Sequence, residues 1–153
     1  MCISNAMFHG NGGELRSQGY TACVFLHDLH SDQRSPLLTM ASRMMSADAV
    51  LHDMELAILT QLREEMALPM SWRPQSGTLD ELLSHFTTPR HQAIVVLSLL
   101  RVARADRQLA PEERGMIQHV VRSFNMPHQT VRDLARWLSQ YHALLDEGNT
   151  LLG

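Results

Sequence analysis

Residues 105–113 read Ala-Asp-Arg-Gln-Leu-Ala-Pro-Glu-Glu, and residues 47–55 read Ala-Asp-Ala-Val-Leu-His-Asp-Met-Glu. Both stretches begin with Ala-Asp, continue with a Leu at the same spacing, and end on a Glu. A constant offset separates the two copies, since 106 − 48 = 58. Repetition at a fixed offset indicates a structural unit that occurs twice in one chain.

The repetition extends into the residues on either side of this signature. At the same offset Arg43 falls on Arg101, and Pro69 falls on Pro127. Apolar positions also fall on apolar positions, namely Ile58, Leu59, Leu62, Met66 and Leu68 on Met116, Ile117, Val120, Phe124 and Met126. We therefore expect two equivalent helical units, at about residues 40–69 and 98–127, with the signature in the corner of each.

Helix signals along the chain predict an all-α fold of about seven helices. Ser35-Pro36 and Thr88-Pro89 each pair a capping residue with a first-turn proline, and Thr78 begins a capping box. Gly148 is expected to close the last helix. The predicted helices lie at about residues 15–30, 35–47, 53–66, 78–86, 88–103, 111–124 and 129–145. Within the fifth of these helices, the run from Ile94 to Ala103 is apolar almost all round, which favours a central helix with the two units packed around it.

Chain length and composition favour a single helical domain in the cytoplasm. Residues 14–153 form the expected single helical domain, whereas residues 1–13 are glycine-rich and without periodicity, as in a disordered lead or the remnant of an expression tag. A net charge of −3 argues against a nucleic-acid binder. No apolar run is long enough for membrane insertion, and two cysteines without a C-x-x-C motif favour a cytoplasmic location.

The repeated carboxylates are the main candidate functional residues. Each Asp is expected where a helix ends and each Glu in the first turn of the next. An anion at a helix C-terminus is disfavoured by roughly 0.3–1 kcal/mol, so the Asp must either accept hydrogen bonds from the turn or be neutralised by a cation. The candidate metal ligands are Asp48, Glu55, Asp106 and Glu113, with Asp53, Glu112 and His52 as auxiliaries.

Ligand chemistry indicates which ion such a site would favour. Oxygen ligands favour calcium or magnesium, whereas a contribution from His52 would shift the preference toward zinc or manganese. The spacing from Asp to Glu copies the second half of an EF-hand calcium loop. The first half does not match, because Val102 and Arg104 stand where oxygen ligands are expected and Arg107 replaces the glycine after Asp106.

The doubled signature resembles that of the TerB-like domain of tellurite-resistance proteins. The resemblance covers roughly residues 36–147 and is carried by Ala-Asp, Leu and Glu at positions 47, 48, 51 and 55 and again at 105, 106, 109 and 113. It implies an all-helical cytoplasmic domain whose acidic cluster binds a divalent metal during tellurite and general chemical stress. The chain departs from the family pattern in lacking the glycine after Asp in both copies, where it has Ala49 and Arg107.

Other polar groups suggest further alternatives. His27 and His30 would share a helix face suitable for zinc, although surface histidines are the simpler interpretation. A basic patch of Arg101, Arg104, Arg107 and Arg114 would bind phosphate or an acidic partner, but a solvated helix face or ion pairs with Asp106 and Glu112 would explain these residues equally.

Three functions follow from these patterns. The first is a non-enzymatic, TerB-like metal-binding module. The second is a helical adaptor for an unidentified protein partner, in which the carboxylates are structural caps; a homodimer is also open. A metal-dependent hydrolase is a weaker third, because the sequence contains no recognised nucleophile motif and no lysine for phosphate-loop chemistry.

Overall fold

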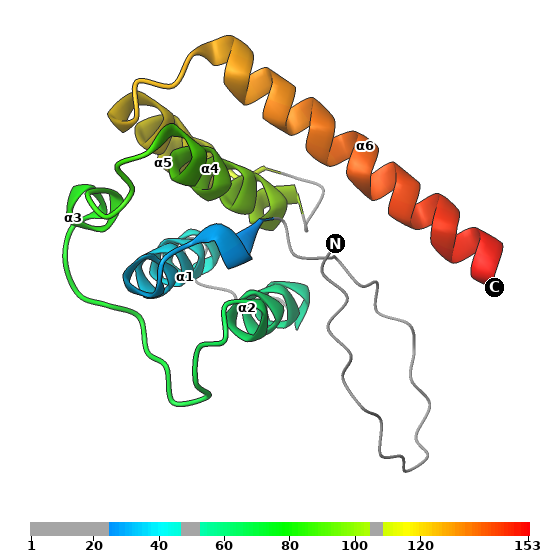
Figure 1. Ribbon diagram of the computed structural model, residues 1–153, viewed down its shortest axis with the longest axis horizontal. Coiled ribbons are helices and arrows are strands. Elements are labelled where there is room, and N and C mark those ends of the chain that lie inside the picture. Colours follow the sequence, from blue (N-terminus) through cyan, green and yellow to red (C-terminus); the bar gives the residue numbers. More distant parts are fainter. Residues whose placement is uncertain (1–24, 47–52, 105–108) are drawn as a thin grey trace.

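The computed structural model describes residues 25–46, 53–104 and 109–153. Within these ranges every regular element is a helix, which confirms the all-α fold class (Figure 1). The elements are a short 3-10 helix, η1 (Leu26–Asp28), and the α-helices α1 (Ser31–Met45), α2 (Asp53–Glu65), α3 (Leu79–Leu83), α4 (Pro89–Arg104), α5 (Pro111–Ser123) and α6 (His128–Leu152). The predicted lead, residues 1–13, lies outside the described residues.

The helix bounds reproduce the sequence repeat. α2 begins at Asp53 and α5 at Pro111, and α2 ends at Glu65 and α5 at Ser123, so both ends differ by the 58-residue offset. The starts of α1 and α4, Ser31 and Pro89, differ by the same offset. The helix pair α1/α2 is thus structurally equivalent to the pair α4/α5.

The two units also end in the same backbone geometry. Ala67 and Asn125, which are equivalent positions, both adopt positive φ angles, of 54° and 48°. The amide of Leu68 donates to the carbonyl of Arg63, and at the equivalent place the amide of Met126 donates to that of Val121, each at 3.0 Å. A left-handed residue followed by such a bond is a Schellman-type helix end, which satisfies the last carbonyls of α2 and α5.

The apolar residues matched by the repeat form one core. All ten belong to the main hydrophobic cluster, fully or partly buried. The predicted central helix, α4, shares the centre with α1, because α1 is buried on most of its faces as well. Leu37 of α1 and the equivalent Val95 of α4 are both completely buried. The core is thus centred on the contact between two equivalent helices.

One contact marks the relation between the two units. The Nε2 of Gln33 in α1 lies 3.1 Å from the Nδ1 of His91 in α4, and these residues are 58 positions apart. Two equivalent positions touch each other when a two-fold rotation relates their units. Such a rotation exchanges α1 with α4 and α2 with α5, so a contact between α1 and α5 should be matched by one between α4 and α2. Both are present, the second through the Arg101–Glu65 bond. The two units are therefore arranged about an approximate two-fold axis near Gln33 and His91.

Near the N-terminus, the last part of one predicted helix and the start of another are wrong. Residues 25–30 do not continue a predicted helix from residue 15, because Leu29 is extended after the short η1. α1 begins at Ser31 rather than Ser35, and Pro36 lies inside it. The Gln33 side chain accepts the amide of His30 at 3.0 Å and fixes the earlier start. The Ser35 hydroxyl accepts the Trp72 indole N–H at 2.9 Å instead of capping a helix.

Other boundaries are confirmed or corrected by local hydrogen bonds. The Thr78 capping box is present, with Glu81 accepting the Thr78 amide at 2.6 Å, but α3 ends at Leu83 rather than Phe86. The amide of His91 donates to the Thr88 hydroxyl at 3.2 Å, which confirms the start of α4. Gly148 does not end α6, which continues to Leu152.

The long helix α6 lies along one side of the molecule and extends beyond α4 (Figure 1). Its 25 residues give a length of about 37 Å. It packs mainly against α4, where Leu138 is completely buried beside Leu97. Among the described helices none is both long and apolar enough to cross a membrane.

Candidate functional site

The repeated acidic signature is only partly described by the structure. Asp48, His52 and Asp106 lie outside the described residues, as do Ala49 and Arg107 at the positions of the missing glycines. Asp53 and Glu55 lie in the first turn of α2, but their side chains also lie outside the description. Glu112 and Glu113 lie in the first turn of α5, as the spacing predicts, with Glu112 exposed.

Glu113 acts as a helix cap. Its Oε2 accepts the backbone N–H of Ala110 at 2.9 Å, and the residue is only 6% exposed. A Glu at the third helical position that binds the N-cap amide is half of a capping box. Ala110 has no hydroxyl to complete the box, so of its two bonds the one accepted by Glu113 is present. One oxygen of this candidate metal ligand is therefore already used by the backbone.

The described residues bring together no group of three or more His, Cys, Asp or Glu side chains able to hold a metal ion. The histidine pair considered for zinc does not share a helix face, because His27 lies in η1 and His30 is extended before α1. His27 instead contacts Asp28 at 3.1 Å, and the ring of His30 lies edge-on to His91. Both His27 and His30 are exposed, as surface histidines are expected to be.

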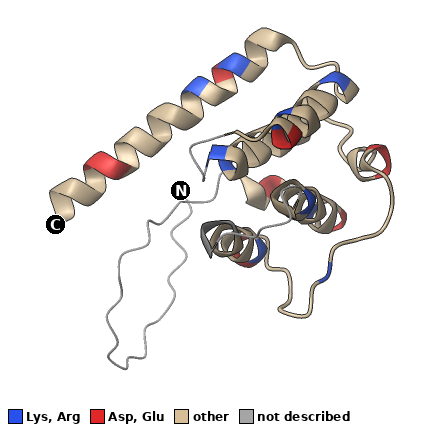
Figure 2. Ribbon diagram, turned by 180° about the vertical axis from the view of Figure 1, so that it is seen from behind, with Lys and Arg blue, Asp and Glu red and all other residues tan. Residues whose placement is uncertain are grey.

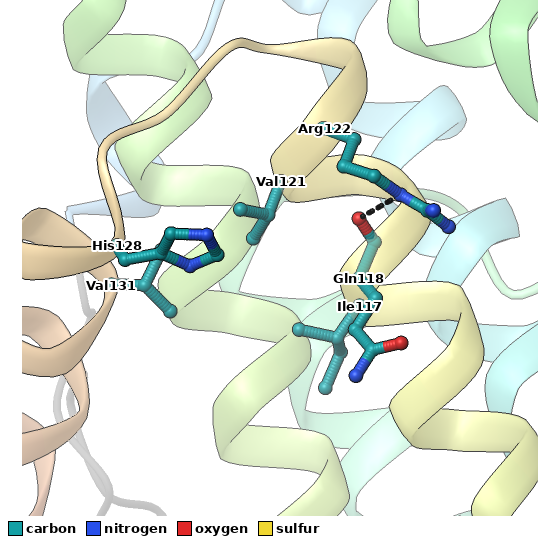
Figure 3. A pocket seen from close by; sticks show the side chains of 6 residues that line it. All are labelled: Ile117, Gln118, Val121, Arg122, His128 and Val131. Carbon is teal, nitrogen blue, oxygen red and sulfur yellow. Dashed lines mark hydrogen bonds between the residues drawn. The ribbon is translucent and has the colours of Figure 1, made fainter.

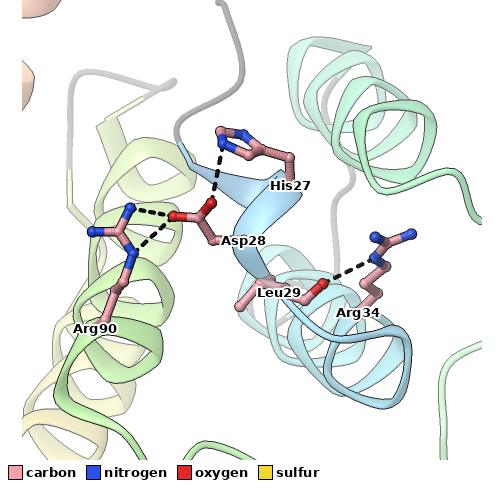
Figure 4. Close-up of polar contacts among 5 residues, drawn as sticks. All are labelled: His27, Asp28, Leu29, Arg34 and Arg90. Atoms are coloured by element: carbon pink, nitrogen blue, oxygen red, sulfur yellow. Dashed lines mark hydrogen bonds and ion pairs between the residues drawn. The ribbon is translucent and has the colours of Figure 1, made fainter. Parts of the chain in front are cut away.

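An ion pair connects η1 to the start of α4 (Figure 4). Arg90 donates from Nε to the Oδ2 of Asp28 at 2.8 Å and also contacts it through Nη2. This hydrogen bond holds the pKa of Asp28 below its usual value. The Arg90 guanidinium also lies 5.8 Å from the centre of the Phe25 ring, so it fixes the segment leading into α1 at two points.

Of the four arginines predicted to form a basic patch, Arg107 lies outside the described residues, and the other three make separate contacts or are exposed on different helices. Arg101 is 4% exposed and donates through Nη1 and Nη2 to both oxygens of Glu65, at 3.1 and 3.2 Å. The expected solvated face is therefore wrong for Arg101. Arg104 is exposed and donates to the Ala135 carbonyl of α6 at 3.2 Å, while Arg114 is exposed on α5. The spacing of residues in the sequence does not predict that Arg101 pairs with Glu65.

His142 of α6 is a half-buried group that the sequence did not single out. Its Nε2 is buried and has no hydrogen-bond partner within the described structure. Burial, together with the positive charges of Arg104 and Arg101, lowers the pKa of His142 below its ordinary value of 6.5. The neutral form of the His142 imidazole is therefore favoured by its surroundings.

Two hollows flank the first half of α6. A cavity of about 330 Å³ between α5 and α6 is lined by Ile117, Gln118, Val121, Arg122, His128 and Val131 (Figure 3). One of its polar side chains is engaged locally, as the Arg122 Nε donates to the Gln118 carbonyl at 3.3 Å. A larger groove of about 500 Å³ lies between η1, α4 and α6 and is lined mainly by Phe25, Ala93, Ile94, Leu97, Leu134 and Trp137. We call it the α4/α6 groove.

One face of α6 carries apolar side chains that the described core covers only in part. The indole of Trp137 stacks on Tyr141, with ring centres 5.3 Å apart and planes 8° apart. Further along, Leu144, Leu151 and Leu152 are 66%, 80% and 89% exposed. The α6 stripe, defined as Leu134, Trp137, Tyr141, Leu144, Gly148 and Leu151, has alternating spacings of three and four residues. Such a stripe is typical of a helix that packs along another helix.

Comparisons of the chain with models of protein families, with curated proteins and with solved structures find no match.

Proposed function

We propose that this protein is a non-enzymatic helical interaction module that binds an amphipathic helix of a protein partner along the α6 stripe. The observation that carries the proposal is the continuity of this stripe from the α4/α6 groove to the exposed end of α6. Its leucines and aromatic rings keep the 3.5-residue period that two packed helices share. Large exposed apolar side chains on one face typically mark an interaction site.

The lining of the groove supports a helical occupant. Its walls are apolar and include Leu97, Leu134 and the rings of Phe25 and Trp137, which are tilted against each other at 5.9 Å. Arg90 also lines the groove, where its charge is paired with Asp28. A partner helix with an apolar face would therefore fit this groove.

The test compares partner retention by matched variants. We expect the wild-type chain to bind a protein that the double variant Leu144→Glu, Leu151→Glu loses, whether that protein is another copy or a different chain. Met70→Glu is the control, because Met70 is 83% exposed but lies in the linker before α3. If the double variant and the control retain the same proteins as wild type, the α6 stripe is not a binding face.

A second candidate is the TerB-like, cytoplasmic, metal-binding module associated with tellurite and chemical stress. The matching bounds of α2 and α5 favour it, because they put Glu55 and Glu113 in equivalent helix turns directly after the two Ala-Asp pairs. In this proposal a divalent ion binds Asp48, Glu55, Asp106 and Glu113. Calcium or magnesium is favoured, because the ligands are oxygens.

A titration with calcium, magnesium, manganese and zinc tests the metal proposal. Binding should be lost in the double variant Asp48→Asn, Asp106→Asn; equal binding by both proteins, or none by either, would exclude it. Glu113 separates capping from metal binding. Glu113→Gln keeps an acceptor for the Ala110 amide, whereas Glu113→Ala should cost about 1 kcal/mol of stability. For the stability effect alone, Glu112→Ala is the control, since Glu112 is exposed beside Glu113.

A further inference from the structure

We propose that the helix bound by the α6 stripe is α6 of a second copy of this chain, so that the protein forms an antiparallel homodimer. This inference rests on the interaction function proposed above and adds the identity of the partner. It follows from the register of the stripe, the position of one glycine and the distribution of charge along α6.

The register of the stripe is self-complementary. Its alternating spacing assigns Leu134, Tyr141 and Gly148 to one set of core positions and Trp137, Leu144 and Leu151 to the other. When two such helices run antiparallel about a two-fold axis, the sets face each other in reverse order. The facing pairs are then Leu134 with Leu151, Trp137 with Gly148, and Tyr141 with Leu144. Every pair occurs twice, as an interface with two-fold symmetry requires.

This register places the largest side chain of the stripe opposite the smallest. A glycine inside a helix costs about 1 kcal/mol relative to alanine, yet Gly148 lies within α6. The chain's own packing does not require it, because a Cβ at Gly148 would meet nothing within 4 Å in the described structure. The space above Gly148 is instead the space that Trp137 of the second copy would occupy.

The same register brings the exposed end of one α6 to the α4/α6 groove of the other copy. Leu151 would lie opposite Leu134, which lines that groove together with Leu97 and Trp137. The groove and the exposed leucines are thus two halves of one interface, both present in every chain. This reciprocity favours a second copy over an unrelated helix.

Charge along α6 favours the antiparallel direction (Figure 2). The first half carries Arg132, Arg136 and one acid, Asp133, whereas the second half carries only the acids Asp146 and Glu147. Antiparallel pairing sets the acidic half of each helix alongside the basic half of the other, while parallel pairing would set acid beside acid. Because Arg132, Arg136 and Asp146 lie away from the stripe by helical spacing, this is a long-range attraction along the helices and not a set of ion pairs across the interface. The helix dipoles also oppose each other in the antiparallel pair.

Sedimentation equilibrium of the purified full chain, from micromolar to hundreds of micromolar, tests the inference. We expect a concentration-dependent dimer, which the double variant Leu144→Glu, Leu151→Glu converts to a monomer with unchanged helical circular dichroism. Gly148→Ala should raise the dimer Kd at least about tenfold by crowding Trp137 of the partner. Gly115→Ala is the matched control, because a Cβ at Gly115 in α5 also meets nothing within 4 Å, and it should leave the Kd unchanged.

Disulfide cross-linking checks the register even if a variant folds poorly. With Cys2 and Cys23 replaced by serine, Leu134→Cys combined with Leu151→Cys should form a covalent dimer, whereas either substitution alone should not. A wild-type chain that stays monomeric throughout, or Gly148→Ala with an unchanged Kd, overturns the homodimer. If the wild-type monomer binds a protein from lysate that the Leu144→Glu, Leu151→Glu variant does not bind, the proposed interaction function survives. If the wild type and the double variant bind the same proteins, both proposals fail.

Discussion

At the scale of single residues, the buried pair of Arg101 and Glu65 connects the two units. Both oxygens of Glu65 receive guanidinium N–H groups from Arg101, whose side chain is almost inaccessible to solvent. Removing one partner of a buried pair leaves the other charge uncompensated, whereas replacing both with apolar groups of similar volume is often neutral.

We expect Glu65→Ala to reduce the free energy of unfolding by about 3–5 kcal/mol. The double variant Arg101→Met, Glu65→Met should recover most of this loss in urea denaturation. Arg43→Met is the control at the equivalent position of the first unit, where, among the described residues, the arginine donates to the Gln75 carbonyl at 2.8 Å and is more exposed. A loss from Arg43→Met as large as that from Glu65→Ala would contradict this account.

His142 predicts how stability depends on pH. Its pKa is lowered in the folded state, so between that value and the unfolded value near 6.5 the unfolded chain binds more protons. Stability from this group is therefore present above about pH 6.5 and is lost as pH falls through the folded pKa. Asp146 opposes the shift, whereas Arg101 and Arg104 promote it.

Thermal unfolding of wild type and His142→Gln across this pH range measures the effect. The melting temperature of wild type should fall more steeply toward acid than that of His142→Gln. His128→Gln is the control, because His128 is exposed at the start of the same helix. Parallel curves for wild type and His142→Gln would show that His142 does not carry the dependence.

At the scale of the elements, the Schellman-type ends of α2 and α5 predict how glycine substitutions at two equivalent positions change stability. Ala67 holds a positive φ that costs an alanine roughly 1 kcal/mol and costs glycine little. Ala67→Gly should therefore raise the free energy of unfolding by about 0.5–1 kcal/mol in chemical denaturation. Asn125→Gly should gain less, since asparagine tolerates this conformation better than alanine. A destabilising Ala67→Gly would contradict the geometry.

Most elements were predictable because their signals are local. Thr78, Thr88 and Pro111 mark helix starts through capping chemistry that involves only neighbouring residues. The helix start predicted from Pro36 and the helix end predicted from Gly148 are wrong. The Gln33 cap starts α1 before Pro36, and α6 remains helical through Gly148. The Arg101–Glu65 pair could not be predicted, because it depends on how two helices from different units meet.

Among the carboxylates, too, the local positions could be predicted from the sequence and the long-range contacts could not. The first-turn position of Glu113 follows from its distance to Pro111, and the structure has it there. Its bond to the Ala110 amide belongs to the capping alternative already visible in the sequence. The approach of the four carboxylates to a single ion is a long-range property, and it stays a prediction.

At the scale of the whole molecule, the end of α6 contributes little to the core. Leu138 is the only completely buried residue of this helix. Deleting residues 144–153 should therefore change the free energy of unfolding of the monomer by less than about 1 kcal/mol, as surface changes usually do. Denaturation at dilute concentration measures this, and a collapse of cooperative unfolding would show that the segment belongs to the core.

The contact between Gln33 and His91 has a chemical consequence. In an assembly of two identical chains, a residue that meets its own counterpart across the axis must pair with an identical side chain. Here the two equivalent positions, 33 and 91, belong to one polypeptide, so each can carry a different amino acid. Gln33 can therefore donate its amide to the His85 carbonyl while facing the imidazole of His91. Covalent linkage of the two units thus permits, at their axis, a pairing of unlike side chains that strict symmetry forbids.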